Sequence, residues 1–127
     1  MRNQTAASAY KHATYDSAPP LKIVHMMYAG ALRFIGQAQS LDPKTEAKEF
    51  DKILQKASAV IFELRVSLDH EVAPELCRDL TALYLFAEDR IRLSLLDRTA
   101  DPLTAAVSTL ETLFEGWKGV EVTEQRG

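Results

Sequence analysis

Four long segments of this sequence have the residue pattern of helices, and a proline stands at the head of each one. In every segment apolar residues recur at intervals of three and four positions, which places them on one face of a helix. Proline suits the first turn of a helix, because the amide hydrogen that it lacks would have no acceptor there. The segments begin at Pro20, Pro43, Pro74 and Pro102. Since no segment alternates polar and apolar residues as a strand does, the sequence predicts an all-α fold.

The predicted helices cover most of the chain. We expect them at about residues 20–41, 43–68, 74–96 and 102–118. Asp42 and Asp101 precede the second and fourth helices and are suited to cap them. The connections are short, and short connections place consecutive helices side by side and antiparallel. The sequence therefore predicts an antiparallel up-and-down four-helix bundle over residues 20–118, preceded by an extended N-terminal segment, residues 1–19, and followed by a flexible tail, residues 119–127.

The composition limits the classes of function. A chain of 127 residues has the size of one domain and can bury a core of its own. Its net charge of −3 and the lack of any run of Lys and Arg argue against nucleic acid as a partner. The first residues lack the apolar stretch of a secretory signal, and the apolar segment 21–35 is too short to cross a membrane. Because Cys77 is the single cysteine, no internal disulfide can form, and we expect a cytoplasmic protein without membrane insertion.

The apolar faces of the predicted helices differ in width. The segment 21–35 is apolar over roughly half of its circumference, as a helix with two or three neighbours in a bundle requires. The fourth helix has a narrower stripe, and Trp117 is part of it. For the third helix we assign the core face to Leu76, Leu80, Leu83, Tyr84, Ala87, Ile91 and Leu95.

Several apolar residues are left over once each helix has a core face. On the second and third helices they are Phe62, Val66, Leu85, Phe86, Leu93 and Leu96. Single exposed apolar residues are common, whereas a contiguous patch indicates a binding surface. Two interpretations remain open at this point: these residues form such a surface, or the core extends further around the two helices than the periodicity indicates.

Residue patterns of known catalytic and metal sites are missing. The sequence has no glycine-rich phosphate loop, and none of its histidines follows a glutamate at the Glu-x-x-His spacing of di-iron bundles. Cys77 lies at the edge of a core face, without a sequence feature that would activate its thiol. His25 invites comparison with the His-x-x-Lys-Gly of phosphotransfer bundles, but Tyr28 and Ala29 replace the lysine and the glycine. We expect a non-enzymatic protein that needs no cofactor or metal.

Three segments carry a family resemblance. They are APPLKIVHMMYAGA, Ala18 to Ala31; KASAVIFELRVSLD, Lys56 to Asp69; and LYLFAEDRI, Leu83 to Ile91. In their order and spacing, together with Trp117, they resemble the flagellar export chaperone FliS family, and the resemblance extends from Tyr10 to Lys118. The sequence departs from the family at Ala29 and Leu85, where aspartate is usual, and it lacks the serine that usually precedes the first proline.

The resemblance implies a function in the export of flagellin. Members of this family bind the disordered C-terminal region of flagellin in the cytoplasm, prevent its premature polymerisation and deliver it to the flagellar type III export apparatus, without nucleotide or metal. The client wraps around the bundle and uses apolar grooves. Such a client would dock on the surplus apolar residues, so we expect Phe62, Val66, Phe86 and Leu93 to bind it, followed by Leu85 and Leu96. Tyr10 and Tyr15 are expected either to form an N-terminal lid over this surface or to pack permanently against the first helix.

Two other functions remain compatible with the residues. A diverged helical-bundle module could bind a different secreted client or associate with itself, which the two missing aspartates favour. A phosphotransfer bundle could use His25, and phosphoryl transfer that is abolished by His25→Gln would identify it.

Overall fold

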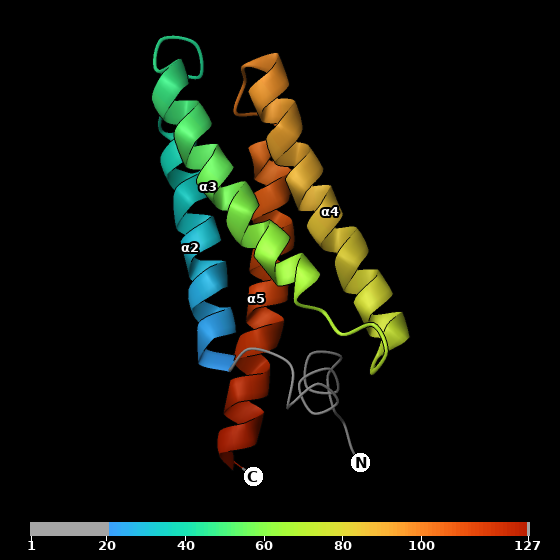
Figure 1. Cartoon of the computed structure of the whole chain (residues 1–127). Coiled ribbons are helices and arrows are strands. Elements are labelled where there is room, and N and C mark those ends of the chain that lie inside the picture. The colour runs from blue at the N-terminus through green and yellow to red at the C-terminus, as the bar shows by residue number, and fades with distance from the viewer. Residues whose placement is uncertain (1–20, 127) are drawn as a thin grey trace.

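The structure, a computed structural model, describes residues 21–126 of the chain and their side chains as far as Gly119. Its helices are α2 (Leu21–Gln39), α3 (Ala47–Val66), α4 (Pro74–Asp97) and α5 (Leu103–Arg126) (Figure 1). The predicted all-α fold is confirmed for this part of the chain. Tyr10 and Tyr15, which the sequence assigns to an N-terminal lid, lie outside the described residues, as does the whole of the segment 1–19.

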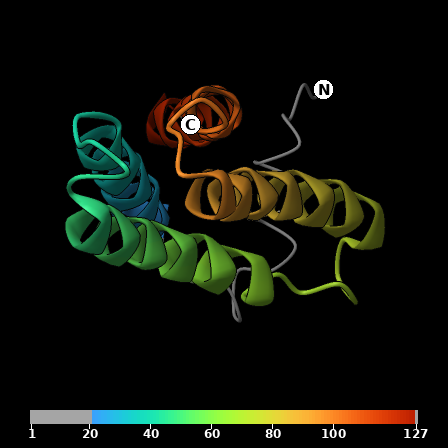
Figure 2. The ribbon, with the colours of Figure 1, turned by 90° about the horizontal axis from the view of Figure 1, so that it is seen from above.

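The helices form an up-and-down bundle. Each helix runs antiparallel to the one before it in the sequence (Figure 1). α2 packs against α3 and α5, and α4 packs against the same two helices, so α2 and α4 face each other across the centre (Figure 2). This is the arrangement that short connections favour, and it confirms the predicted four-helix bundle.

The core consists of one apolar stripe from each helix. Within a stripe the buried residues are three, four or seven positions apart, as one face of a helix requires. They are Val24, Tyr28, Ala31, Ile35 and Ala38 of α2; Phe50, Leu54, Ala57, Ile61 and Leu64 of α3; Cys77, Leu80, Tyr84, Ala87 and Ile91 of α4; and Leu103, Ala106, Leu110 and Trp117 of α5. The assignment of Leu83 to the core was wrong, because its position on α4 lies at the edge of the buried stripe and leaves the side chain exposed.

Three aromatic residues form a hydrogen-bonded group inside this core. The hydroxyl groups of Tyr28 and Tyr84 lie 2.5 Å apart, which joins α2 directly to α4. The indole Nε1–H of Trp117 donates to the Tyr28 hydroxyl over 3.1 Å and adds α5. Burial raises the pKa of Tyr28 to about 12, although both hydrogen bonds act in the opposite direction. The polar atoms of the three side chains are thereby paired within the core, as buried polar groups need to be.

Asp42 does not cap α3, whose N-cap residue is Glu46, but its side chain caps the turn that precedes the helix. Asp42 Oδ1 accepts the backbone N–H groups of Lys44 (2.8 Å) and Thr45 (3.1 Å), and the Asp42 N–H donates to Glu46 Oε1 (2.9 Å). These bonds close a turn over residues 42–46, and α3 begins only at Ala47. The two backbone hydrogen bonds hold the pKa of the Asp42 carboxyl below its usual value.

The ends of α4 and α5 also differ in detail from the prediction. α4 ends at Asp97, and its C-cap residue Arg98 has a left-handed backbone conformation with φ 56°. α5 continues to Arg126, whereas the sequence predicted its end near Lys118. A single glycine in a helix costs about 1 kcal/mol relative to alanine. Gly119 alone therefore does not end α5, because no proline or second glycine follows within the helix.

Candidate functional site

Two adjoining hollows lie along the seam between α3 and α4. One has a volume of about 430 Å³ and is lined by Ser58, Leu85, Glu88, Asp89, Ile91, Arg92 and Leu95. The other has a volume of about 490 Å³ and is lined by Gln55, Ser58, Ala59, Phe62, Glu63, Glu88 and Leu95. Because Ser58, Glu88 and Leu95 border both hollows, we treat these residues together as one α3–α4 groove.

Two of the six residues predicted to bind a client line this groove. Phe62 stands on the α3 side and Leu85 on the α4 side, with 47% and 46% of their surfaces exposed. Val66 is 50% exposed and follows Phe62 by one turn of α3. Leu96 is 65% exposed and, eleven positions after Leu85, falls on the same face of α4. These four residues thus border one side of the bundle.

Phe86 and Leu93 lie outside the groove. They are seven positions apart and therefore share one face of α4, turned by about 100° from the face of Leu85. Phe86 is 42% exposed, and the guanidinium of Arg90 lies 5.3 Å from the centre of its ring. Leu93 is half-buried. Phe62, Val66, Leu85, Phe86 and Leu96 consequently do not belong to the core.

Part of the groove is formed by residues that the sequence pattern did not assign to a binding surface. Leu95 was assigned to the core, yet its half-buried side chain lines both hollows. Ser58 and Glu88 are polar and gave no periodic signal, although both lie at the centre of the groove. The small size of Ser58 within the seam between two helices is the one signal that could have indicated a gap there.

An ion pair joins the two walls of the groove near Phe62. Arg65 Nε donates to Glu88 Oε2 over 2.7 Å, and Arg65 Nη2 donates to Glu88 Oε1 over 3.3 Å. Both side chains are largely covered, with 24% and 17% of their surfaces exposed. The same guanidinium lies 5.1 Å from the centre of the Phe62 ring. The hydrogen bond to Glu88 raises the pKa of Arg65, so the pair combines a fork of hydrogen bonds with a stacked aromatic ring.

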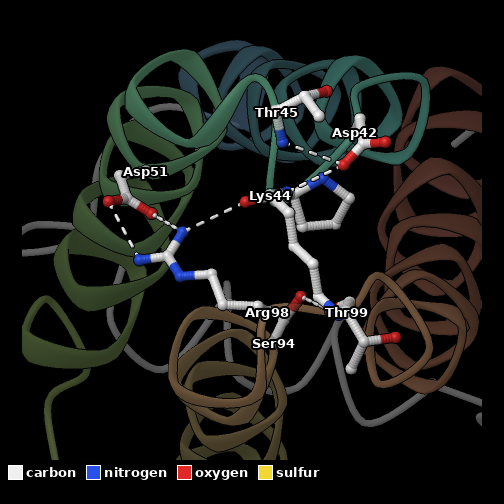
Figure 3. A network of polar contacts seen from close by, with 8 residues as sticks. Asp42, Lys44, Thr45, Asp51, Ser94, Arg98 and Thr99 are labelled. Carbon is white, nitrogen blue, oxygen red and sulfur yellow. Dashed lines mark hydrogen bonds and ion pairs between the residues drawn. The ribbon is translucent and has the colours of Figure 1, made fainter.

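A second ion pair joins α3 to the C-terminal end of α4. Arg98 Nη1 and Nη2 donate to the two carboxylate oxygens of Asp51 over 2.7 and 3.1 Å (Figure 3). Arg98 Nη1 also donates to the carbonyl oxygen of Pro43 over 3.5 Å, which adds the α2–α3 connection. In the same view the Ser94 hydroxyl donates to the carbonyl oxygen of Thr99. This end of the bundle is therefore held by polar contacts among three segments.

Further charges beside the groove lie on α4. Asp89 accepts hydrogen bonds from Arg92 (2.6 and 3.2 Å) and from Arg90 (3.1 Å). The bond from Arg92 contributes most to a lowered pKa of the Asp89 carboxyl. The groove thus has apolar walls at Phe62, Leu85 and Leu95 and a polar margin, which is the composition of a surface that binds an amphipathic segment.

Comparison with known proteins identifies the family of the chain. A family model described as "Flagellar protein FliS" matches residues 1–124. The chain belongs to the FliS family. It is similar to the flagellar secretion chaperone FliS of Campylobacter jejuni, with 26% identity over 124 residues that cover 98% of this chain and 97% of the relative.

FliS is a family of chaperones rather than of enzymes. In this member His25 and Cys77, the two residues compared with catalytic groups, both make packing or hydrogen-bond contacts within the bundle. The ring of His25 packs edge-on against Phe114, with 5.7 Å between ring centres. Cys77 is buried, its Sγ donates to the carbonyl oxygen of Asp69 over 3.3 Å, and burial raises the pKa of its thiol. A raised pKa disfavours the reactive thiolate.

The described part of this FliS chain shows neither a metal-binding cluster nor a helix that could span a membrane. No group of three or more His, Cys, Asp or Glu side chains among these residues could hold a metal ion. None of the four helices has the length and apolar character that would let it cross a membrane.

Proposed function

We propose that this protein binds the disordered C-terminal region of flagellin in the cytoplasm, prevents its premature polymerisation and supports its delivery to the flagellar type III export apparatus. Membership of a flagellar secretion chaperone family supports this function. The single structural observation that supports it most is the α3–α4 groove, which exposes Phe62 and Leu85 on opposite walls.

The groove has suitable chemistry for a client that folds as it binds. A short amphipathic helix would place apolar side chains between the walls of the groove and its charged side toward the margin. Apolar burial contributes about 25 cal/mol per Å², and ordering of a disordered segment opposes binding by about 2–5 kcal/mol or more. A segment that fills both hollows can therefore bind without nucleotide or metal if the free energy gained from apolar burial exceeds the cost of ordering the segment.

The outer faces of α3 and α4 extend the proposed client surface. Val66 and Leu96 continue the groove side, and Phe86 and Leu93 offer a second apolar strip on α4 for a client that wraps around the bundle. Tyr10 and Tyr15 retain their proposed role as an N-terminal lid that the client displaces.

Calorimetric titration with the C-terminal segment of flagellin from the same genome tests the function. We expect a one-to-one complex of micromolar or tighter affinity with a negative heat-capacity change, because apolar surface is buried. Phe62→Asp should weaken binding at least tenfold, since it places a charge in the apolar wall. Val72→Asp is the matched control: Val72 is 42% exposed but does not line the groove. No heat from the folded wild-type protein at several temperatures would contradict the proposal.

A diverged client is the second candidate, and Leu85 is the observation that favours it. This residue lines the groove at a position where the resemblance gives aspartate as usual. A leucine there makes the wall more apolar and suits a more apolar client, whether another secreted protein or a second copy of this chain. Binding of flagellin by Leu85→Asp but not by the wild-type protein would support this candidate, and sedimentation would detect self-association.

A further inference from the structure

We propose that the two ion pairs Arg65–Glu88 and Asp51–Arg98 are struts that hold α3 and α4 apart and keep the α3–α4 groove open before a client binds. The consequence for client affinity rests on the proposed function. The separation of the helices is a property of the client-free protein and can be measured without a client.

The struts occupy two levels of the same seam. The Asp51–Arg98 pair lies at the end of the bundle that carries the α2–α3 connection (Figure 3). The Arg65–Glu88 pair lies farther along the two helices, in antiparallel register with the first. On α3 the groove residues Gln55 and Ser58 fall between the two levels, and on α4 Arg92 and Leu95 do so. The struts therefore bracket most of the length of the groove.

The side chains between the struts would permit a narrower seam. Ser58 is small, and helices approach each other more closely where small residues face the partner. Hollows of about 430 and 490 Å³ remain there instead. Both hollows are open to solvent, and closing them would remove apolar surface from water. The two ion pairs that cross the seam are placed where they can oppose such a closure.

The partly buried ion pairs supply this opposition. A guanidinium and a carboxylate joined by two hydrogen bonds form a rigid unit of fixed length. The side chains are 24% and 17% exposed in the pair Arg65–Glu88, and both are 35% exposed in the pair Asp51–Arg98. Closing the seam would remove this remaining hydration, and the attraction within an ion pair does not fully replace it. Charged struts therefore resist a closure that apolar side chains would allow.

The backbone at Arg98 agrees with such a role. Its φ of 56° is a conformation that glycine adopts with less strain and that commonly ends helices. Glycine would end α4 equally well but would have no side chain to reach Asp51. Arg98 thus ends α4 and also supplies the side chain that pairs with Asp51.

Replacement of one strut by apolar residues tests the proposal. In Arg65→Leu/Glu88→Leu we expect an equal or higher melting temperature, because apolar pairs often match or exceed buried ion pairs in stability. We expect flagellin affinity to fall by about tenfold or more. Spin labels on cysteines introduced at Gln55 and Arg92, with Cys77→Ala in the background, should come closer together in the client-free variant. A loss of binding caused by unfolding would instead lower the melting temperature.

Two matched variants complete the experiment. The charge-reversed Arg65→Glu/Glu88→Arg restores a strut of the same length and should recover binding and label separation relative to the leucine variant. Glu115→Leu/Lys118→Leu replaces an exposed ion pair of α5 in the same way, away from the groove, and should change neither quantity. An unchanged label separation in the leucine variant would overturn the proposal, and so would a charge-reversed variant that remains as weak as the leucine variant. If the wild-type protein binds no flagellin segment, the proposed function fails, and the label separation alone decides whether the pairs are struts.

Discussion

At the scale of single residues, Trp117 has two separable contributions to the core. It fills space with an indole that is 4% exposed, and it donates a hydrogen bond to Tyr28. Trp117→Ala should lower the free energy of unfolding by about 3–5 kcal/mol, because it leaves a large cavity. Trp117→Phe retains most of the volume but removes the N–H, so its loss should be smaller. Urea unfolding followed by circular dichroism measures both, and an unchanged midpoint in Trp117→Ala would show that α5 does not dock at this residue.

At the scale of a secondary-structure element, the turn that leads into α3 depends on the charge of Asp42. Its pKa is lowered from 3.8 in the folded protein by backbone N–H groups of Thr45 and Lys44. A lowered folded pKa means that the stabilisation is present above the unfolded pKa and is lost as the pH falls through the folded pKa. The urea midpoint should therefore decrease as the pH is lowered from about 5 towards the folded pKa, which lies below 3.8. Asp42→Asn should reduce this decrease while it keeps a side-chain oxygen that can accept the hydrogen bonds of the turn. The pKa of Asp89 is lowered as well, and its contribution to the pH dependence is the same in the wild-type protein and in Asp42→Asn. Identical pH profiles would refute a role for the Asp42 charge.

At the scale of the whole molecule, the proposed client surface and the core are separate sets of residues. Phe86 has an exposed ring outside the core, so Phe86→Asp should weaken client binding far more than folding. Titration calorimetry and a thermal melt on the same sample check this pair of effects. Leu110→Asp is the opposite case, because Leu110 is fully buried, and it should abolish the folded state itself. If Phe86→Asp lowered stability as much as binding, Phe86 would have to be reassigned to the core.

The parts of this structure that could be predicted from sequence are those that depend on local periodicity. The stripe that contains Ile61 and the exposure of Phe62 follow from neighbours three or four positions away, and the start of α4 follows from Pro74 itself. The start of α3 was misplaced, because a cap residue such as Asp42 specifies the hydrogen bonds of a turn but not the length of that turn.

The groove could not be predicted from periodicity, because it depends on contacts between residues that are far apart in the sequence. Arg65 and Glu88 are 23 positions apart, and Asp51 and Arg98 are 47 apart. Whether such residues meet depends on the axial register of two helices, which the packing of the whole bundle determines. Leu95 shows the same limit. It was assigned to the core face of α4 and does pack against the core, but the gap beside it depends on the side chains that α3 presents.

The position of Trp117 gives this protein a built-in optical reporter. It is the only tryptophan in the chain, and its indole is enclosed by the core and hydrogen-bonded to Tyr28. The proposed client surface lies along α3 and the outer side of α4, whereas this indole belongs to α5 and contacts α2. Intrinsic fluorescence should therefore follow opening of the bundle and stay almost constant when a tryptophan-free peptide is added. Unfolding can then be followed with and without peptide in a single cuvette and without any attached dye, and a higher unfolding midpoint in the presence of peptide would report binding.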